Sequence, residues 1–445
     1  MGLEKFEIHF DNPSAAYFGG QTLSGRLDIT LDAPKKLRGI SIVIKGEANT
    51  EWTEHESYTD SKGQRQSRTK YYHGNEKYFD INYYLMGGPN SPTTEIMAGT
   101  HTYTFTCALP PTLPSSFEGS KGHVRYTVKA TLDRPWKFDQ TCKAAFTIIS
   151  PLDLNLIPRV KTCATLTMEK YFCCCWCKSG PLTGIVKIPY TGFVPGQIIP
   201  MTIEVDNAST TNVLDVVLKL NQIVTYYSHS PSRKSVKKET EIAKCSVGSN
   251  GVPARGSNTF RHDFTIPSLP PSNLSNCGII DIDYEIKVKL EIPGFHSSVR
   301  GNMPITIGTV PLNNIAQVMP VPLEQTANVA GLNAVVPSGD QPVLGWVPPA
   351  VVPGQDAYSL PPPTYEECQF RTNSIMDSTD TEHTKGAIGY APAYPVYNFG
   401  LMPQPPTGYM PLLPGAPTST SGYMPIAQSD GLLDPTAPSA PLEKL

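Results

Sequence analysis

Apolar and polar residues alternate with a period of two along much of the first 308 residues, as they do in β-strands with one buried face. In residues 124–132, Val, Tyr, Val, Ala and Leu fall on one face, while Arg, Thr, Lys and Thr fall on the other. Residues 280–290 alternate in the same way without interruption. Proline and glycine separate such stretches, and no long helical period occurs. The pattern predicts an all-β body, most simply a set of β-sandwiches.

Short motifs of the body occur twice and in the same order. A Gly-Gln pair at residues 20–21 returns at 196–197, and a Leu-Pro-x-Ser motif at 113–116 returns at 269–272, each time before a strong strand pattern. Chance similarity between short β motifs is the alternative, but duplication also explains the kept order. We therefore predict two related sandwiches, residues 1–150 and 181–308, joined by a linker with a cysteine cluster at 151–180.

Composition changes sharply at about residue 308. The last 137 residues, 309–445, hold 23 of the 44 prolines, whereas a usual proline share is about 5%. The same division separates a body of net charge +5 from a tail of net charge −8. A segment so rich in proline and so poor in charge predicts a disordered tail whose short motifs bind partners. Besides binding cargo, the basic body has the alternative of holding the acidic tail loosely, at long range and screened by salt.

Seven sequence motifs follow one another along the body: Phe10-Asp11-Asn12-Pro13 with Tyr17 and Gly20; Gly46-Glu47-Ala48 with Trp52; Leu113-Pro114-Ser115-Ser116-Phe117-Glu118-Gly119; Val124-Arg125-Tyr126; Asp133-Arg134-Pro135-Trp136-Lys137-Phe138; Gly192-Phe193-Val194-Pro195-Gly196-Gln197; and Ile282-Asp283-Tyr284-Glu285-Ile286. In this order they resemble the α-arrestins, or arrestin domain-containing proteins. The resemblance implies two tandem arrestin-type, immunoglobulin-like β-sandwiches that act as an adaptor without catalysis.

The tail contains one well-formed docking motif. Pro362, Pro363 and Tyr365 form a PPxY motif, in which the prolines favour the polyproline II helix that WW domains bind. The resemblance to α-arrestins implies that this motif recruits a HECT-type E3 ubiquitin ligase. A second candidate, Pro405-Pro406-Thr407-Gly408-Tyr409, has one residue too many between proline and tyrosine. We therefore expect one WW-binding site.

Two further kinds of motif lie near the C-terminal end. PTAP and PSAP share Pro438 in the run Pro435, Thr436, Ala437, Pro438, Ser439, Ala440 and Pro441, which resembles the late-domain tetrapeptide that ESCRT-I binds. Tyr409 with Leu412, and Tyr423 with Ile426, fit the YxxΦ sorting signal, which is a loose pattern. Chance matches in a segment rich in Ala, Pro and Ser are the alternative for both.

Four of the ten cysteines crowd into residues 173–177. A tight turn would let Cys174 and Cys177 bind zinc as a CxxC pair, but no second pair is visible. Palmitoylation and small buried apolar side chains in a strand are the alternatives, and the last is favoured. We therefore predict no bound metal and no other cofactor.

Basic residues suited to a phosphorylated or acidic cargo segment lie in the first predicted sandwich. They are Lys35, Lys36 and Arg38, then Arg125 and Lys129 on one face of a strand. A solvated strand face is the alternative. Residues 53–77 read as a long, exposed hairpin loop because charged and polar residues dominate them.

The remaining observations exclude other classes of protein. No catalytic signature such as a nucleophile elbow, HExxH, P-loop or dinucleotide fingerprint is present, so we expect no enzyme. A net charge of −3 argues against nucleic-acid binding, and neither an apolar run of membrane-spanning length nor a secretion signal occurs. We therefore predict a cytoplasmic adaptor, recruited to the plasma membrane and endosomes through its partners, that links receptor or transporter cargo to the ligase. The alternative is an arrestin-fold scaffold that transports cargo without ubiquitin, as a retromer subunit does.

Overall fold

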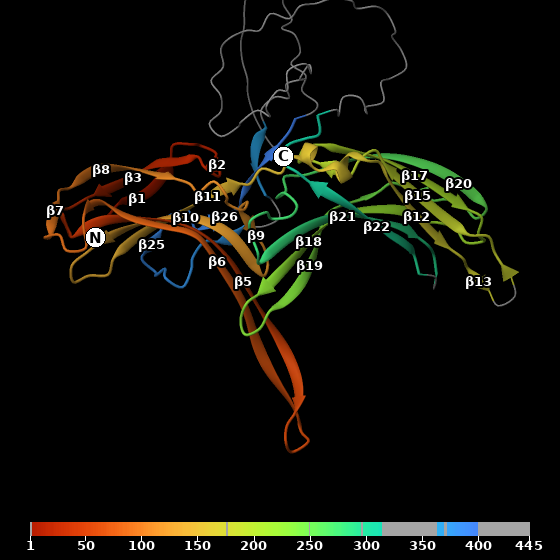
Figure 1. The fold of residues 1–445 in the computed structure, drawn as a ribbon, viewed down its shortest axis with the longest axis horizontal. Coiled ribbons are helices and arrows are strands. Elements are labelled where there is room, and N and C mark those ends of the chain that lie inside the picture. The colour runs from red at the N-terminus through yellow and green to blue at the C-terminus, as the bar shows by residue number, and fades with distance from the viewer. Residues whose placement is uncertain are drawn as a thin grey trace, which may run out of the picture. The chain divides into compact units, whose positions relative to one another are not determined.

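The computed structural model describes residues 2–174, 177–248, 250–294, 297–313, 363–368 and 372–398, without the side chains of 173–178. The first β-sandwich occupies about the first 150 residues (Figure 1). One of its sheets has the order β1 (Lys5–Phe10), β3 (Thr22–Leu31), β8 (Gly99–Ala108). The other has the order β2 (Ala16–Phe18), β11 (Gln140–Ile149), β10 (Gly122–Asp133), β5 (Gly39–Thr59), β6 (Arg65–Gly87), with β9 (Phe117–Glu118) beside β10. Strands β4 (Lys35–Leu37) and β7 (Thr94–Ile96) form a separate pair.

The second sandwich follows two short 3-10 helices, η1 (Leu154–Leu156) and η2 (Pro158–Lys161). One of its sheets has the order β12 (Ala164–Lys170), β15 (Leu182–Ile188), β17 (Ile198–Asn207), β20 (Gly256–Thr265). The other has the order β16 (Gly192–Phe193), β22 (Val299–Ile307), β21 (Ile280–Glu291), β18 (Asp215–Ser228), β19 (Lys234–Ser246). Between β12 and β15, β13 (Cys173–Cys174) pairs with β14 (Cys177–Lys178) in a small hairpin. Within the described part of the chain, no helix is long and apolar enough to cross a membrane.

Burial along the strands follows the alternation in the sequence. In β21 every second residue from Ile280 to Leu290 is buried, and the residues between them are half-buried or exposed. In β10 the apolar set from Val124 to Leu132 is fully buried. Burial of these apolar side chains drives the two sheets of each sandwich together. The predicted all-β fold of two tandem sandwiches is confirmed.

The repeated Gly-Gln motif occupies equivalent turns in the two sandwiches. Gly20 and Gly196 have φ values of +83° and +85°, in the left-handed region that glycine enters without steric cost. In each turn the glutamine that follows accepts a hydrogen bond at Oε1 from the backbone N–H three residues before it, at 2.9 Å for Gln21 and 3.1 Å for Gln197. The two motifs are therefore structural counterparts.

The repeated Leu-Pro-x-Ser motif shows the same correspondence. The hydroxyl of Tyr126 donates to the carbonyl of Pro114 at 2.7 Å, and that of Tyr284 donates to Pro270 at 2.8 Å. The serine two residues after each proline accepts a backbone N–H from β11 or β22, at 2.9 Å in both sandwiches. Because two separate motifs match in their hydrogen bonds, the structure supports the predicted duplication.

The polar stretch at residues 53–77 forms strands rather than a loop. Strands β5 and β6 pair with each other along their whole length, while β10 accompanies β5 only as far as Thr50. At this level the Thr50 hydroxyl donates to the carbonyl of Tyr227 in β18, at 2.7 Å. Beyond the buried, stacked pair of Trp52 and Tyr72, polar residues dominate both faces of the hairpin, so the sequence has no apolar alternation there that would indicate strands.

Part of the predicted disordered tail is folded. Residues 363–368 and 372–398 form β23 (Thr364–Glu367), β24 (Asn373–Ser374), β25 (Thr384–Lys385), β26 (Gly389–Tyr390) and β27 (Ala393–Val396). Strand β25 pairs in parallel with β11 of the first sandwich. The prediction of disorder is therefore corrected for these two stretches, which we call the tail segment. The rest of residues 314–445 lies outside the described residues.

Gly46 offers a test of core packing, since a Cβ there would lie 2.6 Å from the Tyr126 ring and 2.7 Å from the Phe79 ring. We expect Gly46→Ala to lower the free energy of unfolding by about 1–3 kcal/mol, because the two buried rings would have to move. Denaturant unfolding of the full chain measures this. The control is Gly88→Ala, whose Cβ would meet only the Ser91 hydroxyl at 3.3 Å. An equal loss in both variants would contradict the packing argument.

Candidate functional site: the docking surface of the tail segment

The tyrosine of the PPxY motif lies in a strand. Tyr365 is in β23, which pairs antiparallel with β27 and places Pro395 opposite it. Its side chain is half-buried, and burial raises the pKa of its hydroxyl. Pro363 is buried, while Pro362 lies outside the described residues. The C-terminal part of the motif, which contains the tyrosine, is thus held in the folded structure.

Both sandwiches hold the tail segment. The buried hydroxyl of Tyr394 donates to the carbonyl of Ser116 in the first sandwich, at 2.9 Å. The Tyr397 hydroxyl donates to the carbonyl of Thr309 beyond the last strand of the second, at 2.6 Å. The Ser268 hydroxyl, also of the second sandwich, donates to the carbonyl of Glu366 at 2.8 Å. The segment therefore bridges the two sandwiches through its β23–β27 pair.

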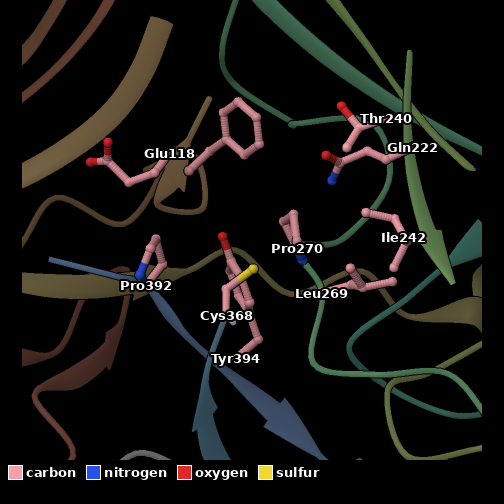
Figure 2. A pocket seen from close by; sticks show the side chains of 10 residues that line it. Glu118, Gln222, Thr240, Ile242, Leu269, Pro270, Cys368, Pro392 and Tyr394 are labelled. Atoms are coloured by element: carbon pink, nitrogen blue, oxygen red, sulfur yellow. The ribbon is translucent and has the colours of Figure 1, made fainter. Parts of the chain in front are cut away.

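This contact is closely packed. Figure 2 shows side chains of β9, β18, β19, the turn at 269–270 and the tail segment facing one narrow space, with Tyr394 and Cys368 on the tail side. The space measures about 20 Å³, which admits one water molecule. Small-molecule sites commonly enclose about 300 Å³ or more. The docked tail segment therefore leaves no room for a small ligand in this contact.

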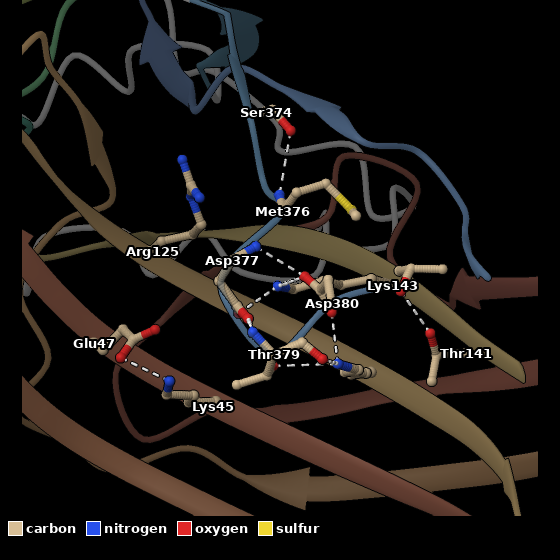
Figure 3. A network of polar contacts seen from close by, with 12 residues as sticks. Lys45, Glu47, Arg125, Thr141, Lys143, Ser374, Met376, Asp377, Thr379 and Asp380 are labelled. Carbon is tan, nitrogen blue, oxygen red and sulfur yellow. Dashed lines mark hydrogen bonds and ion pairs between the residues drawn. The ribbon is translucent and has the colours of Figure 1, made fainter. Parts of the chain in front are cut away.

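A lysine–aspartate cluster fixes the middle of the tail segment (Figure 3). The Lys143 ammonium, on β11, lies 2.7 Å from a carboxylate oxygen of Asp377 and 2.7 Å from one of Asp380. The Lys129 ammonium, on β10, lies 2.5 Å from the other oxygen of Asp380. Lys129 and Lys143 face each other across the two strands. Four charges on three chain segments thus neutralise one another.

Burial makes this cluster sensitive to any loss of charge. The side chains of Lys143 and Asp380 are 3% and 0% exposed. Burial opposes ionisation of both aspartates, but the hydrogen bonds from the lysines outweigh it and hold the pKa of Asp377 and of Asp380 below the ordinary value. Both carboxylates are therefore charged at neutral pH. Because their folded-state pKa values are depressed, the cluster is complete above the unfolded-state pKa and weakens only as pH falls into the acid range.

Arg125 has an internal partner. Its guanidinium makes a bidentate pair with Glu118, at 2.7 and 2.8 Å, and both side chains are buried. The second Glu118 oxygen also accepts a hydrogen bond from the side-chain amide of Asn373 in the tail segment, at 2.8 Å. Arg125 and Lys129 do lie on one side of β10, as predicted, but both are engaged by groups of this chain.

The other predicted cargo-binding residues lie apart from the cluster. Lys35 is buried and donates to the Gln140 side chain at 2.8 Å. Burial, reinforced by neighbouring cations, lowers its pKa to about 8. Lys36 is exposed, and Arg38 is exposed but pairs with Asp133 at 2.6 Å. Lys36 and Arg38 are thus the two of the five that remain at the surface.

Other predicted sites fall outside the described residues, namely Tyr409, Leu412, Tyr423, Ile426 and residues 435–441. The backbone of the cysteine cluster is described in part: Cys174 and Cys177 face each other across the β13–β14 hairpin, as the tight-turn alternative required. Among the described residues, no group of three or more His, Cys, Asp or Glu side chains is arranged to hold a metal ion.

Three residues of the lysine–aspartate cluster were not predicted from the sequence: Lys143, Asp377 and Asp380. Lys143 was one of many basic strand residues, and only the β10–β11 register places it beside Lys129. The expected attraction between basic body and acidic tail is present, but it is a short-range, buried contact. Two aspartates three residues apart in a tail with few charges were the available signal.

The fold and site define an arrestin-type protein whose own C-terminal segment is docked on both sandwiches. Comparison with protein families agrees: residues 6–155 match the N-terminal domain of arrestin (or S-antigen), and residues 178–312 match its C-terminal domain. The chain belongs to the α-arrestins, the arrestin domain-containing proteins. Members of the arrestin family are generally non-catalytic adaptors.

Individual relatives support the same family. The chain is 32% identical to arrestin domain-containing protein 17 of Caenorhabditis elegans, over 69% of this chain and 71% of the relative. It is 27% identical to arrestin domain-containing protein 1 of Mus musculus, over 76% and 71% of the two chains. The human protein of that name is 28% identical, over 72% and 67%.

Proposed function

We propose that this chain is a cytoplasmic trafficking adaptor that brings a WW-domain HECT-type ubiquitin ligase to membrane cargo. Cargo ubiquitination would then promote endocytosis and endosomal sorting, and the C-terminal run at residues 435–441 would add contact with ESCRT-I. The supporting observation is a PPxY motif whose tyrosine, Tyr365, lies on a segment docked against an arrestin-type body. Tethering acts by raising the local concentration of ligase at the cargo.

Ligase binding would require a change in the tail segment. WW domains bind PPxY as a polyproline II helix with the tyrosine side chain in a groove. In β23 the backbone of Tyr365 is paired with β27 and its side chain is half-buried. Because one tyrosine cannot occupy both places, docked and ligase-bound forms exclude each other. The lysine–aspartate cluster would therefore set how much of the protein is ready to bind.

We expect Tyr365→Ala to abolish WW-domain binding by the full chain and to reduce cargo ubiquitination in cells. The reason is the loss of the aromatic group that fills the WW groove. Titration of a labelled WW domain against purified protein measures the first effect. The matched control is Tyr409→Ala, which removes a tyrosine from the misaligned second motif and should leave affinity unchanged.

The same pair of variants separates ligase recruitment from the ubiquitin-independent scaffold. If Tyr365→Ala leaves ligase binding and cargo ubiquitination as they are in the wild type, the ligase-adaptor proposal is wrong. Cargo that is still transported normally by such a variant would favour the scaffold.

A further inference from the structure

The loop at residues 134–139, between β10 and β11, carries the two most exposed large aromatic side chains among the described residues. Trp136 is 102% exposed and Phe138 is 79% exposed. Large apolar groups in such positions are costly in water and commonly mark a contact surface. Neither side chain takes part in the hydrogen bonds and ion pairs that dock the tail segment. The Phe138 ring lies 5.7 Å from the ring of His383.

The backbone holds Trp136 outward. The residue has φ +63°, at the third position of a turn that begins at Arg134 and has Pro135 second. This φ at that position identifies a type II turn, where glycine is the favoured residue. A bulky residue in the left-handed region is strained. Strain kept at a fully exposed tryptophan indicates a function of the side chain outside the fold.

The loop itself is ordered by its own polar contacts. The Arg134 guanidinium donates to the carbonyl of Phe138, at 2.8 Å from Nε. The Arg134 backbone N–H donates to the Asp139 carboxylate at 3.0 Å. The two aromatic side chains are therefore displayed by a closed turn and do not depend on a partner for their position.

Positive charge surrounds the aromatic pair. Lys137 is exposed between them, and Arg38 lines the same surface depression. Burial lowers the pKa of Lys35 to about 8, and the charges of Arg134, Lys385 and Lys137 act in the same direction. The acidic groups here are Asp133, which is paired with Arg38, Asp139, which accepts from the Arg134 backbone, Asp32, whose charge acts on Lys35, and Glu382 beside His383. Cations therefore outnumber carboxylates at this end of the sandwich, and the one exposed between the two aromatic side chains is Lys137.

We propose that this loop docks directly on anionic membrane lipid, with Trp136 and Phe138 inserted at the interface and the surrounding cations on the headgroups. Aromatic side chains favour the membrane–water interface, and basic residues beside them are attracted to anionic lipid. This contact goes beyond the proposed adaptor function, in which partners bring the protein to the membrane. Charge complementarity selects lipid over an apolar protein groove as the occupant.

The test is sedimentation of the full chain with vesicles of phosphatidylcholine alone or mixed with phosphatidylserine. We expect binding to the mixed vesicles and a loss of about ten-fold in Trp136→Gly, since one large apolar side chain leaves the interface. Glycine suits φ +63°, so this variant should fold at least as stably as the wild type. Lys137→Glu should also weaken binding to the mixed vesicles.

Control variants test whether an aromatic side chain at position 136 is what binds the lipid. Trp136→Phe should retain most of the binding, and Tyr71→Ser, which removes another exposed aromatic at 64% exposure, should bind like the wild type. WW-domain affinity of Trp136→Gly should stay unchanged, which separates this proposal from the ligase-adaptor function. Equal binding of wild type and Trp136→Gly to mixed vesicles would overturn the proposal. The proposal would also be overturned if Trp136→Gly bound the mixed vesicles like the wild type and lost only binding to a protein partner, measured without lipid.

Discussion

Replacing both aspartates of the lysine–aspartate cluster, as Asp377→Lys with Asp380→Lys, is expected to raise the affinity of the full chain for a WW domain by about ten-fold or more. The substitutions place four like charges together where Lys129 and Lys143 now balance two carboxylates. The tail segment would then leave the body and free Tyr365 from its strand pairing. Both changes lie in the tail, so the sandwiches keep their own residues.

Two measurements separate release from a nonspecific charge effect. WW-domain titration gives the affinity, and hydrogen exchange of residues 372–398 reports whether the segment has left the body. The control is Asp430→Lys with Asp434→Lys, which changes the net charge of the tail equally without touching the cluster. Faster exchange with unchanged WW affinity would show that docking does not restrict the motif. Unchanged exchange would show that the cluster does not hold the segment.

Arg125→Ala is expected to lower the free energy of unfolding by about 3–5 kcal/mol, because it leaves the Glu118 carboxylate buried without its bidentate partner. Chemical denaturation measures the loss. Arg38→Ala, which breaks an exposed pair with Asp133, should cost less than about 1 kcal/mol. The double variant Glu118→Gln with Arg125→Met removes both charges and should recover much of the stability.

This result bears on how cargo-binding data are interpreted. If Arg125→Ala unfolds like the wild type, the pair is not structural, and Arg125 becomes available as a cargo contact. If it unfolds as expected, a loss of cargo binding in this variant reports damage to the sandwich. Lys36 and Arg38, which are exposed, are then the better residues for testing a phosphorylated or acidic cargo segment.

The strands of the body could be predicted because their apolar residues alternate with polar ones, and the apolar residues are the ones that become buried. In β21 every second residue is apolar, and these residues form the face that the sheet buries. The outer part of the β5–β6 hairpin could not, since polar residues dominate both of its faces beyond Trp52 and Tyr72 and cross-strand pairing defines it. Hydrophobic periodicity indicates a strand only where one face of the strand is buried.

The docked tail segment was missed for a different reason. Composition averaged over 137 residues describes a chain that cannot fold alone, although residues 372–398 hold only two of its 23 prolines. Their order depends on a surface that exists only after the body has folded. The buried hydroxyl of Tyr394 needs the carbonyl of Ser116, and Asp380 needs two lysines from neighbouring strands. No local pattern in the tail encodes either partner.

The described part of the body includes residues 363–368 and 372–398 as well as the residues up to 313. Its folded unit is discontinuous in sequence, because β25 completes an edge of the first sandwich beside β11. A protease cut between residues 313 and 363 would divide the polypeptide without separating its pieces, since the C-terminal fragment would stay bound as a complementing strand. Truncation after residue 312, where the match to the arrestin C-terminal domain ends, would by contrast leave Lys143 without Asp377 and Asp380 and open its position to other acidic peptides.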